Sequence, residues 1–251
     1  MMSDLGNLLV DIVSDMFPVD DVALFLSGGI DSTTVGLACH HAGKRVHAYT
    51  FDVDGIENYD STKAREIADI MGWRHTSVTL TDDGRQQEDV DYMQSFGFCS
   101  DRPSRIIQLY PQYKTLPHIT EQYVTGGFGQ SIAKSELEYS NNPLRIYPSI
   151  DEVREDKLRT IEVTRQLEQW LDALSQPFGI TTRFPFLDTR FKDYFWNWTY
   201  VEATKGYPKH YFHNAFPETQ NRIFGKLRVL GHCEPDTQWH VCTHRHLVGY
   251  Y

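Results

Sequence analysis

The first half of the chain consists of short apolar runs that alternate with longer segments of mixed polarity. Residues 22–26 form a continuous apolar run, which is typical of a strand buried on both faces of a parallel sheet. Residues 32–42 have helical character, and Gly43 lies where a helix C-cap is expected. The next predicted elements are a strand at 46–51, a helix at 59–71 and a strand at 76–80. This order predicts a doubly wound parallel α/β sheet with right-handed crossovers.

The pattern is weaker in the middle of the chain. Helices are predicted around residues 86–95 and around residues 105–110. A fourth strand is predicted at residues 121–125, and a second glycine-rich turn follows it. The middle of the chain therefore extends the predicted sheet by one strand.

A change of character follows residue 147. Ser149 and Glu152 have the spacing of a capping box, and apolar residues recur at helical spacing from there up to residue 175. We expect a long helix at this point and a mostly helical C-terminal extension. The predicted division is an α/β core at residues 1–147 and a helical region at residues 148–251 that packs on the same core.

Charge and composition exclude several classes of protein. The chain has 251 residues and a formal net charge of −10, which argues against broad binding to nucleic acids or anionic membranes, because both need clustered Lys and Arg. No apolar run reaches the roughly 18 residues of a membrane span, and the N-terminus lacks a signal-peptide pattern. We expect a cytoplasmic protein of one large domain, or of a core with an extension.

The turn after the first predicted strand has the composition of an anion-binding site. It consists of Ser27, Gly28, Gly29, Ile30, Asp31 and Ser32. Two glycines let backbone N–H groups approach an anion closely, and the helix that begins here adds unpaired N–H groups and a partial positive charge. The two serines add hydroxyl donors. The turn is therefore predicted to bind phosphate groups at the carboxyl end of a strand, where open α/β sheets bind ligands.

Asp31 does not suit a site for a bare anion, because its carboxylate would repel phosphate. The residue fits if Mg²⁺ lies between the carboxylate and the phosphates. The alternative is a plain Gly-Gly turn in which Asp31 caps the helix. The turn matches neither the Walker A motif nor the dinucleotide-binding glycine motif.

The string Ser-Gly-Gly-Ile-Asp-Ser after a buried strand resembles the pyrophosphate loop of the PP-loop ATP pyrophosphatase superfamily. The resemblance covers about residues 20–130 and implies that ATP is cleaved between its α- and β-phosphates. Members adenylate a carboxylate or carbonyl oxygen, release pyrophosphate, and let a nucleophile displace AMP. It further implies Mg²⁺ held by Asp31, and an adenine site formed through backbone groups by Thr50, Phe51 and Asp52.

A second string resembles the synthetase domain of asparagine synthetase. Residues 183–188 read Arg-Phe-Pro-Phe-Leu-Asp, and the resemblance implies roles for Arg183 and Asp188 near the substrate. Lys226, in Gly-Lys-Leu-Arg, loosely resembles the Lys of the downstream Lys-x-x-Leu-Arg motif, although its spacing is two residues instead of four. The resemblance gives Lys226 a catalytic role at the phosphates. The alternatives are a solvated surface lysine for Lys226, a helix cap for Asp188 and a structural ion pair for Arg183.

Two departures from asparagine synthetase separate this chain from it. The catalytic Cys of a glutaminase domain is missing after Met1, so we expect the amine to come from free ammonia, another amine or a separate amidotransferase. The second loop keeps Gly126 and Gly127 but has none of the three acidic residues of that family. The acceptor is therefore left open as an unknown carboxylate or carbonyl compound.

Two alternative functions remain. The string through Thr33 and Thr34 also resembles 7-cyano-7-deazaguanine synthase, a nucleobase-modifying relative that carries zinc. The tail residues that could bind zinc here are His232, Cys233, Cys242 and His246, against the alternative of scattered histidines and buried thiols. The loss of the acidic second loop also fits a degenerate protein that binds ATP without catalysis.

Overall fold

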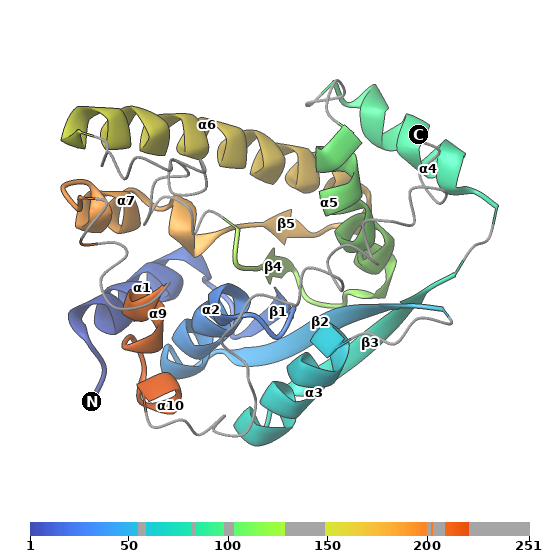
Figure 1. Ribbon diagram of the computed structural model, residues 1–251. Coiled ribbons are helices and arrows are strands. Elements are labelled where there is room, and N and C mark those ends of the chain that lie inside the picture. Colours follow the sequence, from blue (N-terminus) through green and yellow to red (C-terminus); the bar gives the residue numbers. More distant parts are fainter. Residues whose placement is uncertain are drawn as a thin grey trace.

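The protein is built around a five-stranded parallel sheet in the order β3-β2-β1-β4-β5 (Figure 1). The computed structural model describes residues 1–54, 59–81, 84–97, 103–128, 149–199, 202 and 209–220. The strands are β1 (Asp21–Phe25), β2 (Arg45–Val53), β3 (Arg74–Leu80), β4 (Tyr123–Thr125) and β5 (Thr181–Thr182). Each neighbouring pair runs parallel, which confirms the predicted sheet.

Helices cover both faces of the sheet (Figure 1). One core cluster joins the sheet to α1 (Asp4–Met16), α2 (Ile30–His41), α3 (Tyr59–Met71), α7 (Thr189–Phe195) and α9 (His210–His213). The other joins it to α4 (Gln86–Ser95), α5 (Pro103–Thr115) and α6 (Ile150–Ser175). The short helical elements are η1 (Leu116–His118), η4 (Gln176–Phe178), η5 (Pro185–Leu187) and α10 (Pro217–Gln220). The layers are those of a doubly wound α/β fold.

The apolar run that predicts β1 serves both faces. Val22 and Leu24 belong to the cluster with α1 and α2, whereas Ala23 belongs to the cluster with α5 and α6. All three side chains are fully buried. A strand buried on both sides needs a continuous apolar sequence, because successive side chains point to opposite faces.

The long helix α6 begins with the predicted capping box. The Ser149 Oγ accepts a hydrogen bond from the Glu152 backbone N at 3.3 Å, and the Glu152 Oε2 accepts one from the Ser149 backbone N at 2.7 Å. Trp170 and Leu171 are buried on the face that α6 turns to the sheet. The capping box satisfies orphan N–H groups of the first turn, and the apolar face fixes the helix on the core.

The helix α1 and the strand β5 were not predicted from the sequence. The helix α1 has an apolar stripe that includes Leu5, Leu9 and Ile12, and the Ser3 Oγ caps it by accepting from the Gly6 backbone N at 3.2 Å. The strand β5 has only two residues, too few to show a period of two. The stripe of α1 packs on α2, so its local signals were present in the sequence, whereas β5 depends on its pairing with β4.

The C-terminal region contributes to the same sheet and core. The strand β5 extends the sheet beside β4, and the Ser3 backbone N donates to the Ala215 carbonyl at 3.1 Å. The described part of residues 148–251 is mainly helical, as expected. Residues 129–148 lie outside the described part of the chain, so the boundary at residue 147 stays a prediction.

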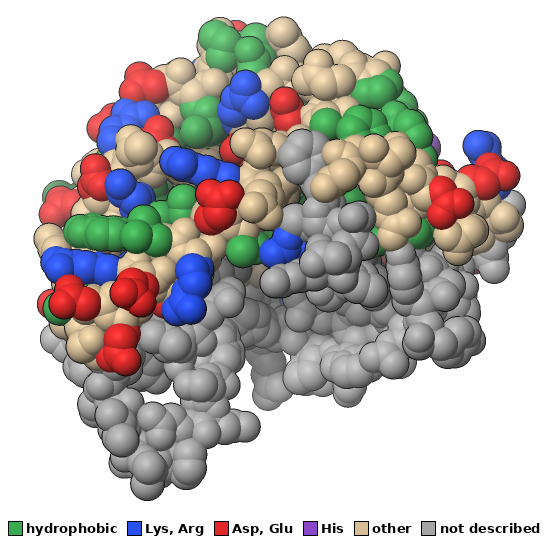
Figure 2. Space-filling view, turned by 90° about the horizontal axis from the view of Figure 1, so that it is seen from above, with side chains coloured by type: hydrophobic (Ala, Val, Ile, Leu, Met, Phe, Trp, Pro, Cys, Tyr) green, Lys and Arg blue, Asp and Glu red, His purple; other side chains and the backbone are tan. Residues whose placement is uncertain are grey.

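The surface above α6 carries charges of both signs. Figure 2 shows basic and acidic side chains mixed on this face. On α6, Arg154 pairs with Asp151 at 3.4 Å, and Arg159 lies 3.7 Å from Asp156. None of the described helices is long and apolar enough to cross a membrane.

Candidate functional site

Two glycine-containing loops meet where neighbouring strands end. The first loop, residues 27–32, follows β1, and the second loop, residues 126–128, follows β4. A Cβ atom placed on Gly127 would lie 2.7 Å from the Ser32 backbone N and 2.9 Å from the Asp31 Cβ. Cβ atoms do not approach other atoms this closely, so only glycine fits where the second loop packs on the first.

A pair of serine hydroxyls holds the first loop together. The Ser27 Oγ lies 3.1 Å from the Ser32 Oγ, which also accepts from the Ser27 backbone N at 3.2 Å. The Gly29 backbone N donates to the Ser27 Oγ at 3.4 Å. Ser27 is exposed and Ser32 is buried, so the loop closes on itself with one hydroxyl left at the surface.

The turn itself requires glycine at position 28. The φ angle of Gly28 is +71°, in the left-handed region that side chains disfavour. A Cβ there would also lie 2.7 Å from the Lys63 Cβ on α3. Gly28 is buried against α3, while Gly29 is half-buried. The chain can therefore turn sharply between β1 and α2 only with a residue that lacks a side chain.

The N-terminus of α2 supplies hydrogen-bond donors at the first loop. Gly29 is the N-cap in extended conformation, and no side chain caps it. The backbone N–H groups of Ile30, Asp31 and Ser32 have no acceptor within the helix, because the first intrahelical bond runs from Thr33 to Gly29 at 3.1 Å. Together with the positive end of the helix dipole, these donors form a site suited to an anion.

Asp31 has one oxygen in an ion pair and one without a partner. Its Oδ2 accepts a charged hydrogen bond from the Lys209 Nζ, and the two side chains are 19% and 6% exposed. Its Oδ1 is buried and has no hydrogen-bond partner among the described residues. A buried carboxylate oxygen without a donor is costly for the fold, so Asp31 is placed to receive a cation or another donor.

Lys209 contacts Asp31 in the site and was not predicted from the sequence. It is the N-cap of α9, with a φ angle of +57°, and is the non-glycine residue with positive φ in the described chain. Such a backbone conformation costs about 1 kcal/mol or more and persists where the surroundings hold it. In the Lys-x-x-Leu-Arg motif the last residue lies four positions after the Lys. Lys209 has Phe212 and His213 at the third and fourth positions after it, so it has the motif spacing that Lys226 lacks. This spacing, with Phe in place of Leu and His in place of Arg, is the signal that could have identified Lys209.

The predicted adenine residues lie on β2 beyond the last residue of β1. The pairing of β1 with β2 ends at Phe25 and Tyr49, so residues 50–52 extend past it. The Thr50 Oγ1 lies 2.9 Å from the His75 Nε2, and the Asp52 Oδ2 accepts from the Ser77 Oγ. Burial lowers the pKa of His75. Since these side chains bind β3, an adenine ring here would meet the backbone of β2 rather than Thr50 or Asp52 side chains.

Arg183 and Asp188 follow β5, but they make structural contacts. The Arg183 Nη1 donates to the Thr182 carbonyl at 2.6 Å and lies 3.6 Å from the Asp172 Oδ1. Asp188 is the N-cap of α7, and its carboxylate accepts from the Arg190 backbone N at 2.8 Å and from the Arg190 Nε at 2.9 Å. The hydrogen bonds from Arg190 lower the pKa of Asp188. A role for either residue at a substrate stays a prediction.

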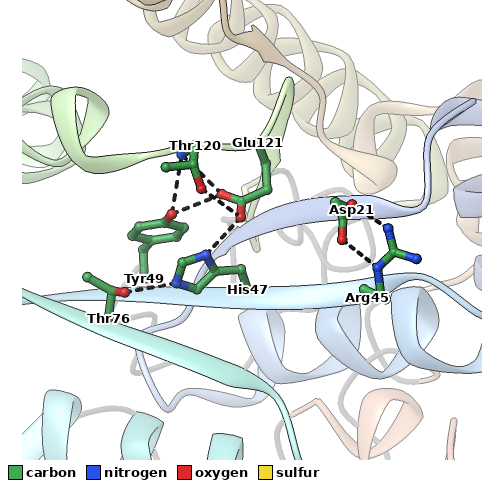
Figure 3. Close-up of polar contacts among 7 residues, drawn as sticks. All are labelled: Asp21, Arg45, His47, Tyr49, Thr76, Thr120 and Glu121. Carbon is green, nitrogen blue, oxygen red and sulfur yellow. Dashed lines mark hydrogen bonds and ion pairs between the residues drawn. The ribbon is translucent and has the colours of Figure 1, made fainter.

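A separate polar network lies at the start of β4 (Figure 3). Glu121 accepts from the Tyr49 hydroxyl at 2.9 Å and pairs with the His47 Nδ1 at 2.8 Å. The other ring nitrogen of His47 lies 2.8 Å from the Thr76 Oγ1, and the Thr120 backbone N donates to Glu121 at 3.2 Å. His47 and Glu121 are buried. The network ties β2, β3 and the start of β4 together.

Other predicted site residues lie outside the described chain. These are Lys226 and the tail candidates for zinc, His232, Cys233, Cys242 and His246. Within the described ranges, no group of three or more His, Cys, Asp or Glu could hold a metal ion. Both the role of Lys226 and the zinc alternative remain predictions.

Comparison with known proteins supports the resemblance seen in the sequence. The family model described as Asparagine synthase matches residues 5–125, which contain the first loop and end at β4. A comparison with curated proteins gave no significant match.

Many solved structures match the chain, and three of them are similar at low identity. One is NMN synthetase from Francisella tularensis (13% identity, 98% of this chain and 94% of that chain, TM-score 0.36). Another is an NH3-dependent NAD synthetase from Campylobacter jejuni in complex with the nitrate ion (18% identity, 69% and 93%, TM-score 0.38). The third is a predicted subunit of a tRNA methyltransferase from Methanocaldococcus jannaschii (18% identity, 67% and 91%, TM-score 0.32). The fold assignment rests on the sheet order and on the helix layers of this protein.

Proposed function

Because residues 5–125 form an asparagine synthase domain of the PP-loop ATP pyrophosphatase superfamily, we propose that the chain is an AMP-forming, ATP-dependent ligase. It activates the oxygen of a carboxylate or carbonyl compound by adenylation and then joins the activated carbon to an amine. The amine is free ammonia, a small amine or the product of a separate amidotransferase. We place this activity in the cytoplasm.

The observation that carries the proposal is the arrangement of donors and charge at the first loop. Three backbone N–H groups at the start of α2 have no acceptor within the helix, and the Ser27 hydroxyl lies at the surface beside them. The Lys209 ammonium lies against Asp31 in the same turn. This combination suits the β- and γ-phosphates of ATP, which need several donors and positive charge.

Mg²⁺ fits the same turn. The Asp31 Oδ1 is a buried oxygen without a hydrogen-bond partner in the described chain, and Mg²⁺ in nucleotide sites uses one or two carboxylates together with phosphate oxygens and waters. When bound to Asp31 and the phosphates, Mg²⁺ would supply neutralising charge for the leaving pyrophosphate.

The reaction proceeds in two balanced steps. In the first, an acceptor oxygen bonds to the α-phosphorus while the bond from that phosphorus to pyrophosphate breaks, and pyrophosphate leaves with the electron pair. In the second, an amine nitrogen bonds to the activated carbon, the bond from that carbon to AMP breaks, and the amine proton passes to solvent. The protein contributes positioning and stabilisation of developing negative charge.

Lys209 and the loop amides have separate parts in the first step. The amides of residues 30–32 bind the phosphates and hold ATP in place, with the adenine along the backbone of Thr50, Phe51 and Asp52. Lys209 is buried and is 178 residues from Asp31 in sequence. Its ammonium is positioned to stabilise the charge on the phosphates as the bond to pyrophosphate breaks.

The test is the effect of Asp31→Asn on AMP and pyrophosphate formation. The assay contains ATP, Mg²⁺, ammonium chloride and a defined mixture of aromatic, aliphatic and amino-acid carboxylates. Asparagine keeps an oxygen that can accept from Lys209 but loses the charge that recruits a cation. We expect AMP formation to fall on the order of 10²–10³-fold.

The matched control is Asp21→Asn, which neutralises an exposed carboxylate on the neighbouring strand β1. It should leave AMP formation at the wild-type rate, with circular dichroism showing both variants folded. Equal rates for the two folded variants would refute the role given to Asp31. Failure of the wild-type protein to bind ATP would refute the proposed function.

A further inference from the structure

The segment that begins with Lys209 lies along α2 and contacts both ends of that helix. Lys209, the N-cap of α9, lies against Asp31 in the first turn of α2. Glu218 on α10 contacts His41, the last residue of α2. At a rise of about 1.5 Å per residue, the helix from Asp31 to His41 is roughly 15 Å long. Residues 209–218 therefore follow α2 from the first loop to its far end (Figure 1).

The contact at the far end of α2 is close and partly buried. The His41 Nε2 lies 3.1 Å from both carboxylate oxygens of Glu218, and the two side chains are 25% and 15% exposed. An ionised carboxylate only accepts hydrogen bonds, so the imidazole N–H donates to it. The His41 ring also stacks on Phe216, with ring centroids 5.4 Å apart and 6° between the planes. His41 therefore contacts the segment through a hydrogen bond and through a ring.

The segment depends on such contacts for its orientation. The helices α9 and α10 have four residues each, and helices this short are not stable by themselves. Between them the Ala215 carbonyl accepts from the Ser3 backbone N at 3.1 Å, and a Cβ on Gly6 would lie 2.2 Å from that oxygen. The helix α1 thus fixes one point of the segment, and the contacts at its two ends fix its direction along α2.

Binding of ATP removes the contact at the near end if the proposed function is correct. The cation then takes the Asp31 carboxylate, and the Lys209 ammonium turns to the phosphates. The far-end contact involves neither residue, so it can hold the segment in both states. Resting on the proposed function, we propose that His41 and Glu218 are positioning residues. They hold residues 209–218 along α2, so that the Lys209 ammonium stays at the first loop while nucleotide is bound.

The first test measures amide hydrogen exchange in the full-length protein without nucleotide. The backbone N–H groups of residues 212–215 donate to carbonyl groups of residues 209–212, so their exchange reports local opening of the segment. His41→Ala should speed this exchange by about three- to tenfold. Exchange at the wild-type rate would overturn the proposal.

The second test separates the rate of AMP formation from the binding of ATP. It uses the carboxylate mixture, Mg²⁺ and ammonium chloride of the assay above. His41→Ala and Glu218→Ala should each lower kcat about tenfold, because a displaced ammonium stabilises the transition state poorly. The KM for ATP should stay within about twofold of the wild-type value, because the amides of the first loop are unchanged. Glu218→Ala tests the same contact if His41→Ala does not fold.

The matched control is Lys114→Ala, which breaks an ion pair of similar burial elsewhere. The Lys114 Nζ lies 2.8 Å from the Asp89 Oδ2, and the side chains are 24% and 12% exposed. This pair joins α5 to α4, away from the segment. Lys114→Ala should leave kcat and the exchange of residues 212–215 unchanged. An equal fall of kcat in Lys114→Ala and His41→Ala would show a general loss of stability and would overturn the positioning role.

A double variant shows whether His41 acts through Lys209. We expect His41→Ala combined with Lys209→Ala to have the kcat of Lys209→Ala alone, within about twofold, because no ammonium remains to be positioned. A further fall of about tenfold, which is the additive result, would overturn the proposal.

The outcomes distinguish this inference from the proposed function. If the wild-type protein forms AMP, and both His41→Ala and Glu218→Ala form it with the wild-type kcat, the inference is overturned and the ligase proposal stands. If the wild-type protein forms no AMP, the ligase proposal fails. The exchange measurement then decides by itself whether His41 holds the segment on α2.

Discussion

The two ends of β4 differ in how their buried polar groups are satisfied. At the end of the strand, the Thr125 Oγ1 and the neighbouring Asp31 Oδ1 are buried without hydrogen-bond partners in the described chain. At its start, Glu121 has His47, Tyr49 and Thr120 as partners, and both ring nitrogens of His47 are engaged (Figure 3). A group left without a partner raises the energy of the free protein, whereas a fully partnered network stabilises it. Under the proposed function the end of β4 belongs to a binding site, whereas the network at its start holds β2, β3 and β4 together.

The largest expected effect is at the binding end, on Lys209. Lys209→Ala removes the ammonium that lies against Asp31, and we expect AMP formation to fall on the order of 10²–10³-fold. The control is Lys192→Ala, which removes a half-buried lysine paired with Asp193 on α7. The measurement is kcat/KM for AMP formation in variants that show wild-type circular dichroism. A wild-type kcat/KM for Lys209→Ala would show that the end of β4 near Asp31 has no catalytic role for this lysine.

The contact between the two loops can be tested by a pair of glycine variants. Gly127→Ala forces a Cβ to 2.7 Å from the Ser32 backbone N, whereas Gly126→Ala meets nothing closer than 3.5 Å. We expect Gly127→Ala to lower the free energy of unfolding by about 1–3 kcal/mol and to weaken ATP binding. Gly126→Ala should keep the wild-type stability. Urea unfolding and calorimetry with ATP measure both quantities, and equal stability of the two variants would contradict the packing of the loops.

At the opposite end of β4, Glu121→Gln should change stability and leave the ATP loop intact. The neutral amide cannot accept from Tyr49, Thr120 and His47 together, so we expect a loss of about 1–3 kcal/mol in the free energy of unfolding. Burial raises the pKa of Glu121, but hydrogen bonds from His47 and Tyr49 outweigh burial and hold it below its ordinary value of 4.5.

The sign of the pH dependence follows from that lowered pKa. The stabilisation by the ionised Glu121 is complete above the pKa of the unfolded chain and is lost as the pH falls through the lower pKa of the folded protein. The wild-type protein should therefore lose more stability than Glu121→Gln as the pH falls from about 5 through this range. The free energy of unfolding is measured with urea at each pH. An equal loss of stability in the two proteins would show that the ionised Glu121 does not stabilise the fold.

The smallest effect is expected at an exposed ion pair near the network. The Arg45 Nη2 lies 2.5 Å from the Asp21 Oδ2, and the side chains are 68% and 56% exposed (Figure 3). The hydrogen bond from Arg45 lowers the pKa of Asp21, but solvent and salt screen exposed pairs. Arg45→Ala should change the unfolding midpoint less than Glu121→Gln does. A larger shift of the unfolding midpoint in Arg45→Ala than in Glu121→Gln would show that the exposed ion pair stabilises the fold more than the buried network does.

The sequence alone was sufficient for the features that are local in the chain. The turn from Ser27 to Ser32 was predicted because a buried strand, two glycines and a helix start lie within a few residues of one another. The capping box at Ser149 and Glu152 was predicted for the same reason, since both partners lie in one helical turn. The doubly wound sheet followed from the order of these local elements.

Features made by distant residues could not be predicted. Lys209 meets Asp31 across 178 residues, and His47 meets Glu121 across 74. The need for glycine at position 127 arises from its contact with α2 and not from the sequence around it. The strand β5 has two residues and exists because β4 offers its edge. Each of these features depends on tertiary packing, which a local sequence pattern does not contain.

The most direct test of the central claim is a crystal structure with Mg²⁺ and α,β-methylene-ATP. The account predicts β- and γ-phosphate oxygens within hydrogen-bond distance of the Ser27 hydroxyl and of the backbone N–H groups of Ile30, Asp31 and Ser32, with a cation at the Asp31 Oδ1. A nucleotide bound elsewhere, with this loop free of phosphate at saturating ligand, would contradict it.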